Sequence, residues 1–195
     1  MTMNDFYQEQ AADYYDSTVK IDPTSFLKPL ADHLEPGASI LDIGCGSGRD
    51  LKWFRERGFA ATGFERAPEL ARRARQFSGC PVIEGDFSTY DFSQLSYDAI
   101  TLIGALVHLP ETELAPTLQR IAKALKPKGL LYLTLKEGQG RQPAPDGRIF
   151  TLWPENNLRE TFTTLDLTIL DFSRKTSKLR SSDTWLGFIL QRRET

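Results

Sequence analysis

The stretch from Gly44 to Gly48 has a glycine at every second position, in the order Gly-Cys-Gly-Ser-Gly. Glycines let backbone N–H groups approach a ligand with no side chain in between. An apolar run that holds one acid, Asp42, precedes the stretch, and a helix is predicted directly after it. Because the N-terminus of a helix favours negative charge, the residue types and spacing indicate a turn that binds an anionic part of a ligand.

Two further acids follow predicted strands later in the chain. Glu65 lies 23 positions after Asp42, and Asp86 directly precedes Phe87. An acid about 20 residues past a glycine-rich turn has the geometry to accept hydrogen bonds from ribose hydroxyls. Each acid also has a simpler interpretation. Asp42 could order the turn through backbone hydrogen bonds, Glu65 could end a strand in solvent, and Asp86 could belong to a Gly-Asp turn.

A histidine and a set of tyrosines add candidate contacts. His108 lies in the run 102–109, which closes another predicted strand, and its imidazole could take a proton from a hydroxyl or an amine. The alternative is a structural histidine that hydrogen-bonds a loop. Near the N-terminus, Tyr7, Tyr14 and Tyr15 share one face of a predicted helix. That pattern is typical of a lid over a site and equally of a helix packed on the core.

The elements that must position these residues follow from the apolar pattern. Strands are predicted at 39–43, 60–64, 82–84, 99–103 and 130–135, with helices at 48–57, 68–77 and 111–125 between them. Helices at 4–17 and 23–34 come first. A glycine- and proline-rich loop at 138–148, a short helix at 154–161 and strands at 164–172 and 185–190 come last. The alternation predicts an α/β sheet covered by helices, and the last two strands must pair antiparallel because no helix separates them.

The glycine spacing separates two kinds of nucleotide site. Arg49 follows Gly48 directly, so the glycines read G-x-G-x-G and not the G-x-G-x-x-G of the dinucleotide fingerprint. The run from Leu41 to Gly48, followed in order by Glu65 and by Asp86 with Phe87, resembles the class I S-adenosylmethionine-dependent methyltransferases of the small-molecule type, within the methyltransferase domain family. The resemblance covers nearly the whole chain.

The resemblance implies a fold and a division of the chain. The fold is α/β, a Rossmann-like three-layer sandwich with a seven-stranded, mostly parallel sheet, an antiparallel terminal strand and helices on both faces. We expect a single domain over residues 1–195. Residues 1–35 form an N-terminal helical lid, residues 36–136 the cofactor-binding core, and residues 137–195 a loop, a short helix and a terminal antiparallel strand pair.

The resemblance also implies S-adenosyl-L-methionine as cofactor, S-adenosyl-L-homocysteine as product and a small-molecule methyl acceptor. Methyl transfer is an in-line displacement, so it needs orientation more than covalent help. His108 is the candidate catalytic base, and no metal ligand is expected. The expected cofactor contacts are Asp42, Gly44, Cys45, Gly46, Gly48, Glu65, Arg66, Asp86, Phe87, Gly104 and Tyr15. Among them, the resemblance gives the ribose to Glu65, where many relatives carry aspartate, and the adenine to Asp86 and Phe87.

Composition and charge indicate where the protein is located and which partners it can bind. The 195 residues carry a formal net charge of −2, and Cys45 and Cys80 are the two cysteines, which argues against a disulfide scaffold. The polar N-terminus has no signal-peptide pattern, and no run reaches the roughly 18 apolar residues that span a bilayer. We therefore expect a cytoplasmic monomer or homodimer that binds neither a membrane nor, given a pI near 5.8, nucleic acid.

Three alternatives stay open at this point. The first is a non-catalytic protein that binds the same cofactor on the same fold and acts in regulation. The second is an RNA methyltransferase, to which the basic runs at 72–75 and 174–180 would point, although solvated surfaces explain them more simply. The third is a nicotinamide-dependent oxidoreductase, which the glycine spacing disfavours.

Overall fold

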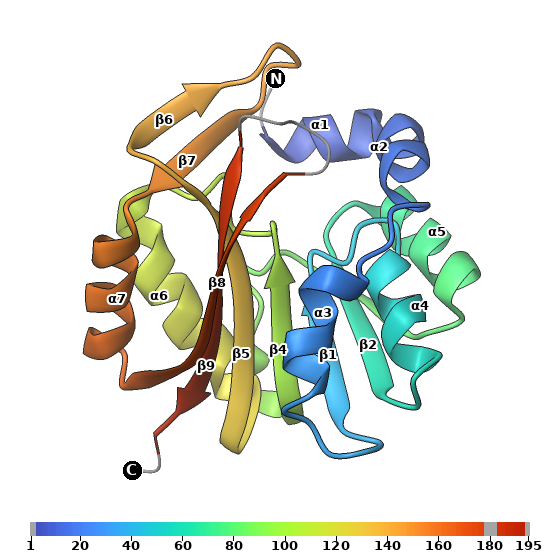
Figure 1. Ribbon diagram of the computed structural model, residues 1–195. Coiled ribbons are helices and arrows are strands. Elements are labelled where there is room, and N and C mark those ends of the chain that lie inside the picture. Colours follow the sequence, from blue (N-terminus) through green and yellow to red (C-terminus); the bar gives the residue numbers. More distant parts are fainter. Residues whose placement is uncertain (1–2, 178–182, 194–195) are drawn as a thin grey trace. The chain divides into compact units, whose positions relative to one another are not determined.

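The computed structural model describes residues 3–177 and 183–193 (Figure 1). Helices and strands alternate over most of this length, as the apolar pattern predicts. The helices are α1 (Met3–Glu9), α2 (Ala11–Thr18), α3 (Thr24–Ala31), α4 (Arg49–Arg55), α5 (Pro68–Ser78), α6 (Glu111–Ile121) and α7 (Glu155–Thr164), with 3-10 turns η1 (Phe92–Gln94) and η2 (Ala122–Ala124). The strands are β1 (Ser39–Ile43), β2 (Ala60–Glu65), β3 (Val82–Glu84), β4 (Tyr97–Ile103), β5 (Leu125–Glu137), β6 (Gly140–Pro143), β7 (Ile149–Trp153), β8 (Leu167–Thr176) and β9 (Thr184–Arg192).

The chain forms two compact units, the first comprising Met1–Tyr90 and Tyr97–Thr101. Its strands lie in the order β3-β2-β1-β4, and every neighbouring pair is parallel. Asp42 in β1 therefore has Gly63 of β2 on one side and Thr101 of β4 on the other. The chain order reverses at β1, so the carboxyl ends of β1 and β4 form the kind of switch point at which open α/β sheets bind ligands.

Local sequence explains where the helices of this unit begin and end. Helix α4 begins directly after Gly48, and α5 begins at Pro68, whose fixed φ suits the first helical turn. Gly79 ends α5 in the left-handed conformation that favours glycine, with φ at 69°. Helices α4 and α5 lie beside β2 (Figure 1) and bury apolar side chains in the core of this unit.

The second unit comprises Asp91–Ser96 and Leu102–Thr195 and is built on β5. Strand β9 pairs antiparallel with β5 from Leu130 to Lys136, and β8 pairs antiparallel with β9. The predicted terminal antiparallel pair is thus confirmed. Helix α7 packs on β8, and the ring of Phe162 in α7 also meets that of Phe188 in β9, with centroids 5.0 Å apart.

The prediction of seven strands is wrong, because the described residues hold nine. The two additional strands, β6 and β7, form an antiparallel hairpin in the segment where the sequence predicts a loop. Its turn is Ala144-Pro145-Asp146-Gly147, in which the N–H of Gly147 donates to the carbonyl of Ala144 at 3.0 Å. Proline, aspartate and glycine in this order are a turn signature, and the apolar run Ile149–Trp153 after it has strand character. Both signals were in the sequence.

The N-terminal helix also differs from its prediction. Instead of one helix over residues 4–17, α1 and α2 are separated at Gln10, whose φ of −102° and ψ of 23° are not helical. Tyr7, Tyr14 and Tyr15 all pack against a buried cluster of Ala11, Ala67 and Leu70. The single domain with its three parts and the three-layer arrangement stay predictions. Among the described residues, no helix is long and apolar enough to cross a membrane.

Candidate functional site

The turn after β1 is held in a conformation that depends on its glycines. Gly44, Gly46 and Gly48 have φ of 73°, 52° and 77°, values that other residues rarely adopt. A Cβ at Gly48 would lie 2.8 Å from the backbone Cα of Ala74 in α5, and one at Gly46 would lie 3.0 Å from the ring of Tyr14. The glycines therefore keep open a backbone surface that α2 and α5 approach closely.

The same turn is hydrogen-bonded to the end of β2. The N–H groups of Gly44 and Cys45 both donate to the carbonyl of Phe64, at 2.8 and 3.2 Å. The Cys45 side chain points inward, because a Cβ on Gly63 would lie only 2.8 Å from its Sγ. Burial raises the pKa of the Cys45 thiol well above its usual range, so the group is an unreactive packing residue, and Cys45 and Cys80 are both free thiols.

Glu65, predicted to accept ribose hydroxyls, already accepts hydrogen bonds from the backbone around it. Its Oε2 accepts from the N–H of Gly46 at 3.0 Å, and its Oε1 accepts from the N–H groups of Arg66 and Ala67 at 2.9 and 3.0 Å. Burial outweighs these donors and raises the pKa of Glu65 above its usual range. Since a carboxylate has about four lone-pair positions, the three bonds leave one position, on Oε2, for a ligand hydroxyl.

Asp42 is buried at the end of β1, with 2% of its surface exposed. Its Oδ1 accepts a hydrogen bond from the Thr101 hydroxyl at 2.7 Å. In the part of the chain that the structure describes, Oδ2 is buried and has no hydrogen-bond partner. Burial first, and then the charge of nearby Asp50, raise the pKa of Asp42 to about 8. The backbone-ordering alternative for Asp42 finds no hydrogen bond among the described residues to support it.

Arg49 is a candidate ligand-binding residue that the sequence reasoning did not select. It is the first residue of α4, and its Nε donates to Oδ1 of buried Asp50 at 2.6 Å. Burial acts to lower the pKa of Arg49, but Asp50 outweighs it and the pKa is raised. Within residues 3–177 and 183–193, its terminal Nη groups have no hydrogen-bond partner. The signal was available, since a cation directly after a glycine turn suits an anionic ligand group.

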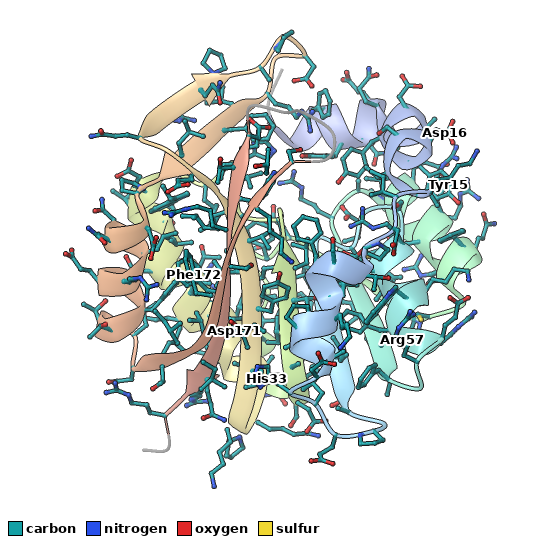
Figure 2. The ribbon with its side chains drawn as sticks, in the orientation of Figure 1. Tyr15, Asp16, His33, Arg57, Asp171 and Phe172 are labelled. Atoms are coloured by element: carbon teal, nitrogen blue, oxygen red, sulfur yellow. The ribbon has the colours of Figure 1, made fainter. Side chains whose placement is uncertain are left out.

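The structure favours Tyr14 over the predicted Tyr15 as the aromatic contact of the turn. Tyr14 lies against Gly46. Tyr15 turns toward α5 (Figure 2), where its ring is 6.2 Å from that of Phe77 and 5.2 Å from the Arg73 guanidinium. The two tyrosines are neighbours in sequence and point in different directions from α2, and Tyr14 is the one that lies against Gly46.

The predicted adenine contacts lie at the end of β3. Oδ1 of Asp86 accepts from the backbone N–H and the hydroxyl of Ser88, at 2.8 and 2.6 Å. Its Oδ2 lies 3.4 Å from an Nη of Arg66. Burial acts to raise the pKa of Asp86, but the Ser88 bonds and the Arg66 charge outweigh it and the pKa is lowered. The carboxylate is thus ionised and an acceptor, and the adjacent Phe87 is half-buried.

Gly104 and His108 belong to the second unit, whereas the other predicted contacts belong to the first. The N–H of Gly104 donates to the Thr134 hydroxyl at 2.9 Å. His108 lies 4.7 Å from the Phe150 ring, and its Nδ1 is 2.7 Å from the carbonyl oxygen of Ile149, so Nδ1 carries the proton. Burial lowers the pKa of His108 to about 4, which leaves the ring neutral at pH 7 with its lone pair on Nε2.

A buried lysine that the sequence reasoning missed lies in the same unit. Lys136, at the end of β5, is 4% exposed, and its Nζ donates to Oδ2 of Asp183 at 2.9 Å. The ammonium also lies 3.7 Å from the centre of the Phe150 ring and 5.7 Å from that of Trp185. Across the described residues, no three His, Cys, Asp or Glu side chains are grouped to hold a metal ion.

Comparison with known proteins identifies the family of the chain. Residues 7–171 match the family model described as "Methyltransferase domain". The chain belongs to this family. This chain is 32% identical over 105 residues to ubiquinone biosynthesis O-methyltransferase of Xanthomonas campestris pv. campestris. The aligned part covers 51% of this chain and 43% of that protein. The homologous enzyme of Xanthomonas axonopodis pv. citri is 33% identical over 117 residues, with 55% and 47% coverage. The chain spans about half the length of the curated relatives it matches.

Solved structures share the fold of this methyltransferase domain. The 1,6-didemethyltoxoflavin-N1-methyltransferase of Burkholderia thailandensis, solved with S-adenosylhomocysteine, aligns with a TM-score of 0.77 at 23% identity and covers 97% of this chain and 85% of its own. Magnesium protoporphyrin IX methyltransferase of Synechocystis, also with S-adenosylhomocysteine, aligns with a TM-score of 0.74 at 15% identity and covers 97% of each chain. At these identities the likeness shows a Rossmann-like α/β methyltransferase fold.

Proposed function

We propose that this chain is an S-adenosylmethionine-dependent methyltransferase that acts on a small-molecule acceptor. The observation that carries the proposal is made at the glycine turn of the first unit. Hydrogen-bond acceptors and donors that are not fully used lie around this turn. Asp42 has a buried oxygen without a partner in the described structure, Glu65 has one lone pair left, and Arg49 has unused donors. A ligand with a cationic group, a hydroxyl and a carboxylate would use all three.

The cofactor's groups match this set residue by residue. Arg49 would hold the carboxylate of the methionyl group, where the N-terminus of α4 also favours negative charge. Asp42 would lie near the sulfonium, the Gly44 carbonyl would accept from the ammonium, and Glu65 would accept one ribose hydroxyl through Oε2. Oδ2 of Asp86 would accept from the adenine amine. When bound, the cofactor supplies an electrophilic methyl group, and these residues orient it and exclude water, which is what in-line displacement requires.

The small-molecule acceptor is supported by the relatives. Their names specify ubiquinone biosynthesis, 1,6-didemethyltoxoflavin and magnesium protoporphyrin IX, which favours a small-molecule acceptor. We propose that the protein is cytoplasmic and is a monomer or a homodimer.

The catalytic role of His108 stays a prediction. Its neutral ring suits a proton acceptor, and a base of this kind contributes about 10²–10⁴-fold to the rate. His108→Ala should therefore lower kcat by that factor, whereas a histidine that only supports the β6–β7 hairpin would lower stability and leave kcat nearly unchanged.

Calorimetry tests cofactor binding directly. The chain should bind S-adenosylmethionine and S-adenosylhomocysteine more tightly than a nicotinamide dinucleotide. Glu65→Ala should weaken binding by about 1.5–3 kcal/mol, the range for hydrogen bonds to a charged group. Glu84→Ala is the matched control, because Glu84 ends the neighbouring strand, pairs with Glu65 in register and forms a surface ion pair with Arg75. It should leave the affinity unchanged.

Turnover separates an enzyme from a non-catalytic binding protein. With a metabolite extract as the source of acceptor, the chain should release S-adenosylhomocysteine, and replacing the extract with total RNA should not raise the release. Binding without release would favour the regulatory alternative, and absence of binding at millimolar cofactor would refute both.

A further inference from the structure

Three carboxyl groups are buried together around the glycine turn. Asp42, Asp50 and Glu65 are 2%, 6% and 8% exposed, and they come from β1, α4 and β2. Arg49, whose side chain is 21% exposed, adds positive charge near Asp42 and Asp50, and its Nε donates to Asp50. Arg66 also acts on Glu65, but a third of its side chain is exposed to solvent. The cluster thus has more acidic groups than cations, in a place where charge is poorly solvated.

Asp42 is the member of this cluster whose charge is least compensated. Thr101 from β4 donates to one of its oxygens, and the other oxygen has no partner in the described part of the chain. Asp50 and Glu65 add negative charge around it, and Arg49 adds positive charge. Burial and Asp50 raise the pKa of Asp42 to about 8, so without a bound cation the carboxyl is mostly protonated at pH 7.

We propose that this carboxyl cluster distinguishes the cationic methyl donor from its uncharged-sulfur product, with Asp42 releasing its proton to solvent when the sulfonium binds and regaining one when the sulfur loses its charge. The inference rests on the proposed function. A positive charge brought into a poorly solvated site stabilises a nearby carboxylate. Once the methyl group has left, the carboxylate is again uncompensated and takes up a proton, which weakens retention of the product relative to the donor.

A proton-releasing Asp42 and a purely structural Asp42 predict different protonation in the donor and product complexes. A carboxyl that only supports the strand end through Thr101 would keep the same protonation with either ligand. The donor and the product have the same ammonium and carboxylate, so a difference in proton release between them reports on the sulfonium charge. An analogue with a protonated amine in place of the sulfonium, sinefungin, provides a third ligand that carries the charge without a transferable methyl group.

Calorimetry at pH 7 in buffers of different ionisation enthalpy counts the protons exchanged on binding. S-adenosylmethionine and sinefungin should each release about 0.9 proton from a carboxyl that titrates near pH 8, and S-adenosylhomocysteine should release much less. The ratio of donor to product affinity should rise close to tenfold between pH 6 and pH 7 and level off above pH 8. These comparisons use the unmodified chain.

Two variants locate the proton. Asp42→Asn keeps the shape and can still accept from Thr101, and it should abolish the difference between donor and product. Glu84→Gln removes a carboxyl outside the cluster and should behave as the parent chain. Thermal unfolding checks that both variants are folded. Equal proton release with donor and product, or release that persists in Asp42→Asn, would overturn the proposal. If none of the three ligands binds, the proposed function fails as well.

Discussion

Replacing Glu65 with glutamine changes one oxygen of a buried carboxylate into an NH2 group and leaves the side-chain shape intact. The carboxylate accepts three backbone N–H bonds, one from Gly46 and two from Arg66 and Ala67. An amide has a single acceptor atom. In its better orientation the amide oxygen keeps the two bonds at Oε1, and its NH2 group then faces the N–H of Gly46.

The magnitude follows from these contacts. The variant loses one hydrogen bond to a charged group, worth about 1.5–3 kcal/mol, and leaves the Gly46 N–H without its acceptor. Burial raises the pKa of Glu65, which means that the ionised group already carries a desolvation cost that the amide avoids. This gain offsets part of the loss. We therefore expect the free energy of unfolding to fall by about 1.5–2 kcal/mol, near the low end of that range.

Urea denaturation measures the global effect, and amide hydrogen exchange measures the local one. The Gly46 amide should exchange faster in Glu65→Gln, while amides in β5 and β9 should keep their protection relative to global unfolding. Glu84→Gln makes the same chemical change at an ion pair with Arg75 on the surface, so it should alter stability by less than about 0.5 kcal/mol.

Two results would contradict this reasoning. A variant as stable as the parent chain would show that the three N–H bonds do not hold the turn. Unchanged exchange at Gly46 in a destabilised variant would show that the loss arises elsewhere.

Three further predictions concern packing, charge and pH. Gly48→Ala should destabilise the protein by several kcal/mol more than Gly37→Ala. Both glycines have a positive φ, but only a Cβ at Gly48 would press on the backbone of α5. Equal losses of stability in urea denaturation would refute this close approach. Asp183→Ala should cost about 3–5 kcal/mol by leaving Lys136 buried and unpaired, whereas the double variant Lys136→Met/Asp183→Ala should cost much less, since apolar side chains can replace a buried ion pair. A double-mutant cycle that shows no coupling would argue against the pair. The raised pKa of Asp42, about 8, means that folding takes up a proton, so stability from this group is present below about pH 4 and is lost as pH rises through 8. Asp42→Asn should flatten that decline in free energy of unfolding between pH 4 and pH 8, and identical slopes would exclude the shift.

Much of the fold could be predicted because its signals are local. Strands β1 and β3 have the predicted boundaries, and the glycine turn, Glu65 and Asp86 follow strand ends in the predicted order. The hairpin β6–β7 was missed although its turn residues were visible, because a glycine- and proline-rich segment was interpreted as a loop. The sequence pattern groups Tyr14 and Tyr15 on one helical face, so it could not tell that Tyr14, and not the predicted Tyr15, lies against Gly46.

The sequence by itself determined the element order, the backbone turn and the acids at the strand ends, since each depends on residues close together in the chain. Only the tertiary structure decided how those acids are used. Asp42 owes its raised pKa to burial and its one hydrogen bond to Thr101, a residue 59 positions away. Glu65 has a single lone pair left because the backbone folds around it. Hydrogen bonding and desolvation are set by what surrounds an atom in space, so the order of residues could place these groups but could not fix their protonation or their remaining capacity to bind.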